Sequence, residues 1–196
     1  MRLRSFRTLT GDCAGVTTVE FALIAPALLM SLAALYDVGN MLYVKSLLEG
    51  SMQRAARDST LEGASATTST LDQAITTSVR NAAPGATLTF TRKSYSSFTN
   101  VQRPEDFTDV NSNGTCDSGE PYEDANANST WDADRGKTGQ GSARDAVLYT
   151  ARMTYDLPFP APRLLGYGDT MTLTAQTVLR NQPYSGQAAT IVTRNC

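Results

Sequence analysis

Histidine is absent from the 196-residue chain. The protein therefore has no imidazole, which is the usual general base near neutral pH and the commonest protein ligand of metals. This absence excludes serine–histidine–aspartate catalysis and histidine–zinc sites. Aspartate and glutamate are plentiful, but calcium ligation explains them with fewer assumptions than catalysis does, so we expect no enzymatic activity.

The chain also lacks an excess of basic residues. Its 17 Lys and Arg side chains are outnumbered by 19 Asp and Glu, which gives a net charge of -2 and a pI near 5.1. Without residues 1–15, 14 basic side chains remain against 18 acidic ones. Because nucleic acids bind to basic surfaces, we expect no nucleic-acid partner.

One long apolar run is present, at residues 21–36, and a carboxylate, Glu20, directly precedes it. With residues 16–19 the run reaches the roughly 20 residues that cross a bilayer. A basic segment, residues 1–7, lies on its N-terminal side, and such flanks stay in the cytoplasm. We therefore expect one membrane pass over about 16–36, with the rest of the chain outside the cytoplasm.

Glu20 needs a partner, because a charge inside a membrane helix costs about 2.5–3.5 kcal/mol when it is unpaired. A cut after Gly15 would expose an amine on Val16 and make Glu20 the fifth residue of the mature chain. That amine could be the partner. The alternative is a conventional signal peptide cleaved at residues 31–34, which a carboxylate in the apolar region fits poorly.

Apolar residues keep a helical spacing beyond the membrane segment, at Val38, Met41, Leu42, Leu48, Met52, Ala55 and Ala56. The pattern predicts that one helix, residues 16–57, continues to about Arg57. Its apolar stripe packs either on an outer domain or against the helices of other subunits.

Residues 58–196 are expected to form that outer domain. Within it, 60–70 read as a linker and 71–80 as a second helix, while alternating patterns at 86–95, 146–157 and 171–179 predict three antiparallel strands. The expected fold class is α+β, with the long N-terminal helix packed on a small antiparallel sheet. Residues 96–145, which we call the insertion, are rich in Asp, Asn, Gly and Ser and predict one long loop.

The insertion contains a calcium-loop motif at residues 109–120, which meets the spacing D-x-[DN]-x-[DN]-G-x5-E at every specified position. The candidate Ca2+ ligands are Asp109, Asn111, Asn113, the carbonyl of Thr115, Asp117 and Glu120. Glu120 would close the site with both oxygens. The alternative is a solvated loop whose Asp and Asn side chains bond to their own backbone.

The motif partly recurs fifteen residues later, with candidate ligands Asp124, Asn126, Asn128, Thr130 and Asp132. Ser129 stands at the glycine position and Arg135 where the closing glutamate should be, so this copy is weaker and depends on shared ligands. Pro121 and the short gap leave no room for a helix between the loops. The tandem therefore resembles the helix-free calcium loops of extracellular bacterial proteins.

Cysteine is scarce, with residues only at positions 13, 116 and 196. A cut after Gly15 would remove Cys13 and leave an even pair, Cys116 and Cys196, in an oxidising compartment. We expect a disulfide that ties the insertion to the C-terminus. The alternatives are two unpaired thiols or a link to another chain.

Residues 15–35 resemble a type IV prepilin leader, and more closely the TadE-like pseudopilins of tight-adherence (Tad) pilus systems. The matching features are Gly15, the sequence Thr18-Val19-Glu20-Phe21-Ala22-Leu23, Pro26 and the apolar helix, with further similarity at 55–57, Gly63 and 178–184. The resemblance implies that a prepilin peptidase removes the leader 1–15 by cutting between Gly15 and Val16, and that Glu20 assists assembly. It also implies that other pilin-like subunits and an inner-membrane assembly platform are partners.

Two functions are consistent with these features. The first is a minor pilin or pseudopilin of the inner membrane that joins or primes a Tad (type IVc) pilus, with a Ca2+-stabilised loop in its periplasmic or extracellular domain. The second is a signal-anchored, calcium-dependent adhesion or binding module that is not incorporated in a pilus. Val16 as the first residue requires prepilin processing, whereas an intact Met1 supports a simple anchor.

Overall fold

The computed structural model describes residues 16–59, 68–159, 166, 168–182 and 191–196. The chain divides into two compact units, residues 1–42 with 157–169 and residues 43–156 with 170–196. Gly15, Gly63 and most of the expected linker lie outside the described residues. The fold class is α+β, as predicted: a long N-terminal apolar helix and a small antiparallel sheet.

Helix α1 (Val16–Ser59) is 44 residues long and ends two residues beyond the predicted Arg57. In the first unit its apolar side chains are exposed, among them Val19, Phe21, Leu23, Ile24, Leu28, Leu29, Leu32 and Leu35. Among the described helices, this is the one that is long and apolar enough to cross a membrane. It is therefore a candidate membrane anchor.

Residues 157–159, which are far from α1 in the sequence, also belong to the first unit. Asp37, which is 7% exposed, accepts a hydrogen bond from the main-chain N–H of Phe159 through Oδ1, at 3.1 Å. The rings of Tyr36 and Phe159 pack edge to face with their centroids 5.3 Å apart. A buried carboxylate and an aromatic pair thus hold residue 159 against the helix.

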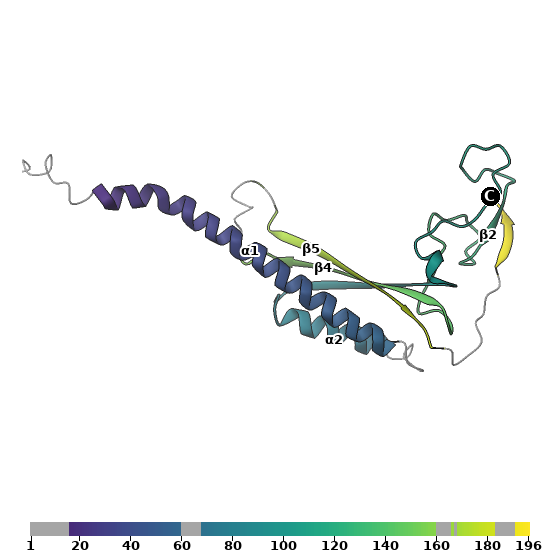
Figure 1. Cartoon of the computed structure of the whole chain (residues 1–196), viewed down its shortest axis with the longest axis horizontal. Helices are drawn as coiled ribbons and strands as arrows, with labels where there is room; N and C mark the ends of the chain where they lie inside the picture. The colour runs from purple at the N-terminus through teal and green to yellow at the C-terminus, as the bar shows by residue number, and fades with distance from the viewer. Residues whose placement is uncertain (1–15, 60–67, 160–165, 167, 183–190) are drawn as a thin grey trace, which may run out of the picture. The chain divides into compact units, whose positions relative to one another are not determined.

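In the second unit, the sheet has the strand order β3-β1-β4-β5, and every pair is antiparallel (Figure 1). Its strands are β1 (Thr87–Tyr95), β3 (Lys137–Thr138), β4 (Ala146–Asp156) and β5 (Thr170–Arg180). β1, β4 and β5 begin and end within a residue of the predicted strands, because all three carry a clear alternating pattern.

The core of the second unit combines residues 43–59 of α1, helix α2 (Thr68–Arg80) and the sheet. Its buried apolar side chains include Val44, Leu48, Met52, Ile75, Val79, Ala151, Met153 and Leu173. Asp72 of α2 makes two hydrogen bonds to Arg92 of β1, at 2.6 and 3.1 Å, and accepts one from the Tyr149 hydroxyl of β4. These contacts show that α2 packs on the sheet.

The insertion is not one continuous loop, and here the sequence prediction was wrong. It contains a short helical turn, η4 (Phe98–Asn100), strand β3, and strand β2 (Pro121–Asp124). β2 pairs antiparallel with β6 (Val192–Asn195) in a second, two-stranded sheet. Both strands have four residues and few apolar side chains, so they give no alternating pattern that the sequence could reveal.

Candidate functional site

The first calcium-type loop, residues 109–120, is organised around Asp109. Its carboxylate accepts hydrogen bonds from the main-chain N–H groups of Asn113, at 3.1 Å, and Gly114, at 2.8 Å. Ser112 and Gly114 have φ values of 60° and 79°. Asp109 therefore stabilises a tight turn in which two residues adopt left-handed conformations, one of them the glycine that the motif specifies.

Glu120 reaches back across this loop. Its carboxylate is 5% exposed and accepts hydrogen bonds from the N–H groups of Val110, at 2.8 Å, and Asp117, at 3.0 Å. The amides of Asn111 and Asn113 donate to Asp117, at 2.8 and 2.6 Å, and these two bonds lower the pKa of Asp117. Hydrogen bonds thus organise the loop around the side chains predicted as ligands. Thr115, predicted to bind through its carbonyl, donates both its N–H and its hydroxyl to Oδ1 of Asn113, at 2.8 and 2.6 Å.

The second loop, residues 124–132, repeats these contacts position by position. Asp124 accepts from the N–H groups of Asn128 and Ser129, and Asp132 accepts from the amides of Asn126 and Asn128. Ala127 and Ser129 have φ values of 64° and 68°, at the positions of Ser112 and Gly114. Ser129 therefore takes the conformation for which the motif uses glycine.

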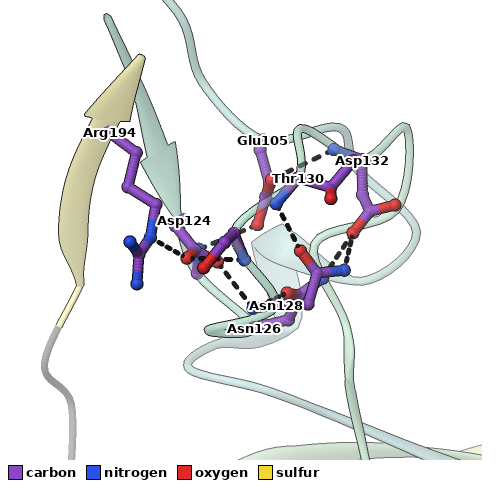
Figure 2. A network of polar contacts seen from close by, with 9 residues as sticks. Glu105, Asp124, Asn126, Asn128, Thr130, Asp132 and Arg194 are labelled. Atoms are coloured by element: carbon purple, nitrogen blue, oxygen red, sulfur yellow. Dashed lines mark hydrogen bonds and ion pairs between the residues drawn. The ribbon is translucent and has the colours of Figure 1, made fainter. Parts of the chain in front are cut away.

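Arg135, at the position of the closing glutamate, does not reach the second loop. Its guanidinium is bound to Asp106, at 2.8 Å, and Glu123, at 3.2 Å. Instead, Glu105 contacts the loop from the preceding segment: its carboxylate accepts from the N–H groups of Ala125, at 2.8 Å, and Asp132, at 3.1 Å (Figure 2). Sequence spacing could not reveal Glu105, because it precedes both motifs.

Asp124 is the most deeply buried carboxylate of the two loops, at 0% exposed. Burial raises the pKa of Asp124, but the hydrogen bond from Arg194 of β6 and those from the loop N–H groups outweigh it, and the pKa falls below its ordinary value. Figure 2 shows Arg194 reaching from β6 to Asp124. Asp124 is therefore an ionised carboxylate at neutral pH.

Among the residues that the structure describes, no three His, Cys, Asp or Glu side chains converge into a ready metal site. A cation in either loop would therefore need amide and main-chain oxygens beside the carboxylates. Calcium accepts such ligand sets, whereas transition metals prefer nitrogen and sulfur. The donor types in both loops fit a hard divalent cation.

Cys116 and Cys196 are joined by a disulfide, with their Cα atoms 5.8 Å apart. Beside it, the N–H of Cys196 donates to the carbonyl of Glu120, at 2.9 Å, and the N–H of Gly119 donates to the carbonyl of Cys196, at 3.3 Å. The C-terminal residues are thus fastened to the first loop through the disulfide and to the second through Arg194.

The N-terminal candidate residues lie in or next to α1. Gly15 is outside the described residues, Val16 is the first residue of the helix, and Glu20 is exposed on it. Residues 15–57 match the TadE-like protein family. The TadE-like segment begins at Gly15 and ends within α1, so the resemblance predicted from the sequence is confirmed there. The predicted similarity at Gly63 and 178–184 lies outside the match.

The comparisons with curated proteins and with solved structures find no match to this chain. The TadE-like segment points to a component associated with a Tad pilus. Neither the sheet nor the two loops are part of that segment. What the second unit does must therefore be argued from its own residues.

Proposed function

We propose that this protein is a minor pilin or pseudopilin that assembles through α1 into a Tad (type IVc) pilus, or primes its assembly. The supporting observation is the coincidence of the TadE-like segment, residues 15–57, with α1. The first part of this helix exposes its apolar side chains, as contact with lipid or with neighbouring helices requires. The last part buries Val44, Leu48 and Met52 in the second unit.

Processing by a prepilin peptidase after Gly15 would give the proposed subunit its assembly-competent end. The new amine of Val16 lies one helical turn from Glu20, because residues four apart share a helix face. An ammonium–carboxylate pair, within one subunit or between neighbours, offsets the cost of placing Glu20 in lipid. The proposed location is the inner membrane, with the second unit in the periplasm or exposed on the pilus.

Calcium binding is the second part of the proposal. In the first loop, Asp109, Asp117 and Glu120 supply three negative charges, while Asn111, Asn113 and the Thr115 carbonyl supply neutral oxygens. This set matches the oxygen ligands that Ca2+ takes in loops of this spacing. A bound ion would stabilise a segment whose internal contacts are polar, and so keep the insertion rigid on an exposed surface.

N-terminal mass spectrometry of protein purified from its native membrane tests the pilin role. We expect Val16 as the first residue. Glu20→Ala should leave cleavage intact and impair pilus assembly, because it removes the partner of the new amine. Glu49→Ala is the matched control, since Glu49 is an exposed carboxylate on the same helix. An intact Met1 in functional protein, or normal assembly of Glu20→Ala, would contradict the pilin proposal.

Calorimetry of the full chain in detergent tests calcium binding. Calcium should raise the melting temperature, with about 2.7 kcal/mol of added stability per site when free calcium is 100 times Kd. EDTA should reverse the effect, and Glu120→Gln should abolish binding at the first loop. Unchanged melting in millimolar calcium and in EDTA, with no heat of binding, would contradict the calcium part alone.

A further inference from the structure

We propose that Glu105 completes a second cation site in residues 124–132, an inference that rests on the proposed calcium binding. The remaining ligands would be Asp124, Asn126, Asn128, the carbonyl of Thr130, and Asp132. Glu105 takes the place of the closing glutamate that this loop lacks in sequence.

The first argument is the symmetry of a short strand pairing between the loops. Phe107 and Tyr122 form an antiparallel bridge, flanked by hydrogen bonds from Thr108 N–H to the Pro121 carbonyl and from Glu123 N–H to the Asp106 carbonyl. Two residues outward on one side, Asp109 is opposite Glu120. Two residues outward on the other side, Glu105 is opposite Asp124. Each loop therefore has its first aspartate facing a glutamate across the pairing.

The contacts of the two glutamates are equivalent. Glu120 accepts hydrogen bonds from the N–H groups of the second and ninth residues of the first loop, Val110 and Asp117. Glu105 accepts from the second and ninth residues of the second loop, Ala125 and Asp132. Glu105 thus makes the same closing contacts, although it arrives from the opposite direction along the chain.

Glu105 is also fixed through its main chain. Its N–H donates to the carbonyl of Asp132, at 3.0 Å, and its carbonyl accepts from the indole N–H of Trp131, at 2.9 Å. The side chain is 1% exposed. Four hydrogen bonds therefore hold this glutamate against the second loop, and Figure 2 shows the two that its carboxylate accepts.

Charge provides a second argument. Glu105 and Asp124 are 1% and 0% exposed, and Asp132 is a half-buried carboxylate of the same loop, although in the described residues the three do not converge as closely as a preformed metal site requires. Within the part of the chain that the structure describes, the cationic side chain bound to this group is Arg194, which pairs with Asp124. Three carboxylates and one guanidinium leave an excess of two negative charges. Buried charge of one sign is costly without a counter-ion, and one divalent cation would balance it.

The hydroxyl group of Tyr122 provides independent support. Tyr122 is 2% exposed, and within the described part of the chain its hydroxyl has no hydrogen-bond partner. Tyr122 and Asp124 share the buried face of β2, and the hydroxyl lies within electrostatic reach of Asp124, Glu105 and Asp132 as well as of the Arg194 guanidinium. Buried hydroxyl groups require a partner. A water molecule held by a cation in the second loop would supply it.

Terbium luminescence can test this site separately from the first loop, because Tb3+ substitutes for Ca2+ and emits when a nearby indole is excited. Trp131 is the only tryptophan of the chain and lies in the second loop. We expect full-length protein in detergent to give a calcium-competed Tb3+ signal through Trp131, and calorimetry to give two calcium ions per chain.

Three variants decide the assignment. Loss of an outer-shell partner typically weakens metal binding by about 10- to 100-fold, so Glu105→Gln, which alters a proposed ligand, should weaken Tb3+ binding at the second loop by at least about 10-fold. Glu120→Gln should remove one calcium ion and keep the Trp131-sensitised signal. Asp106→Asn, an exposed neighbour that loses the same charge, should change neither.

Unchanged Tb3+ affinity in Glu105→Gln would overturn the assignment of Glu105. If Glu105→Gln does not fold, the other measurements still decide: a single calcium ion in wild-type protein that Glu120→Gln eliminates would overturn the second site while calcium binding at the first loop stands. Protein that binds neither Ca2+ nor Tb3+ would contradict the calcium proposal itself.

Discussion

The sheet with its two helices and the insertion bury different kinds of side chain. Between α1, α2 and the sheet, the buried side chains are mainly aliphatic, such as Leu48, Ile75 and Met153. Among the described residues of the insertion, the buried apolar side chains are Tyr122 and Ala143, whereas Glu105, Glu120, Asp124 and Arg135 are buried charges.

This difference indicates that the two regions are stable for different reasons. An apolar core releases water from its surfaces and needs no ligand to do so. Buried carboxylates gain little unless each charge is matched, so the insertion depends on hydrogen bonds and the disulfide, and the proposed cations would add to them. We therefore expect the stability of the insertion to vary with solution conditions, while that of the sheet varies little.

Leu48→Ala should cause the largest loss of stability, in the sheet region, by which we mean the four-stranded sheet with α2 and the part of α1 that packs with it. Leu48 is 0% exposed, and removing such a side chain costs about 2–5 kcal/mol of the free energy of unfolding. Denaturant unfolding measures this loss. Val178→Ala, on the 40% exposed Val178 of β5, is the control and should change stability by about 0.5 kcal/mol or less. Equal losses in the two variants would break the proposed contrast.

Cys196→Ser should have the next largest effect and act on the insertion. The disulfide closes a sequence separation of 80 residues, and removal of such links typically costs about 2–4 kcal/mol. Hydrogen exchange should become faster in residues 109–124 and 192–195, with β4 and β5 still protected. Equal loss of protection in β4 and β5 would show that the two regions unfold together.

Asp72→Asn should cause the smallest loss of stability of the three variants. It weakens the polar contacts of Asp72 in α2 with Arg92 and Tyr149 of the sheet. Asp72 binds the guanidinium of Arg92, which packs 4.1 Å from the ring centre of Tyr149. The variant leaves the Arg92 guanidinium, whose side chain is 12% exposed, without its counter-charge, which costs about 1–3 kcal/mol. Asp58→Asn, on an exposed carboxylate, is the control. A loss no greater than in that control would mean that the Asp72 link is dispensable.

The long helix was predictable from its apolar run and from the helical spacing that follows it, and the three main strands were predictable because each alternates over nine or more residues. The position of β6 was not, because its residues 192–195 are exposed and their pairing with β2 joins segments far apart in the chain. Short polar strands are specified by the partner that they meet rather than by their own pattern.

The two candidate cation sites also differ in how far the sequence could predict them. The spacing of residues 109–120 predicted the first loop, and the structure gathers those side chains. For the second loop the sequence offered Arg135 as the residue at the closing position, whereas the structure brings Glu105 there through the pairing of Phe107 with Tyr122. A ligand supplied across a strand pair has no fixed spacing along the chain, so a local motif cannot contain it.

The sequence by itself determined the apolar helix, the TadE-like segment and the first calcium-type loop, because each depends on residues close together in the chain. The tertiary structure alone decided which carboxylate faces the second loop and which strand carries Arg194 to Asp124. Buried charges must find their partners wherever the fold brings them, and that choice depends on distance in space.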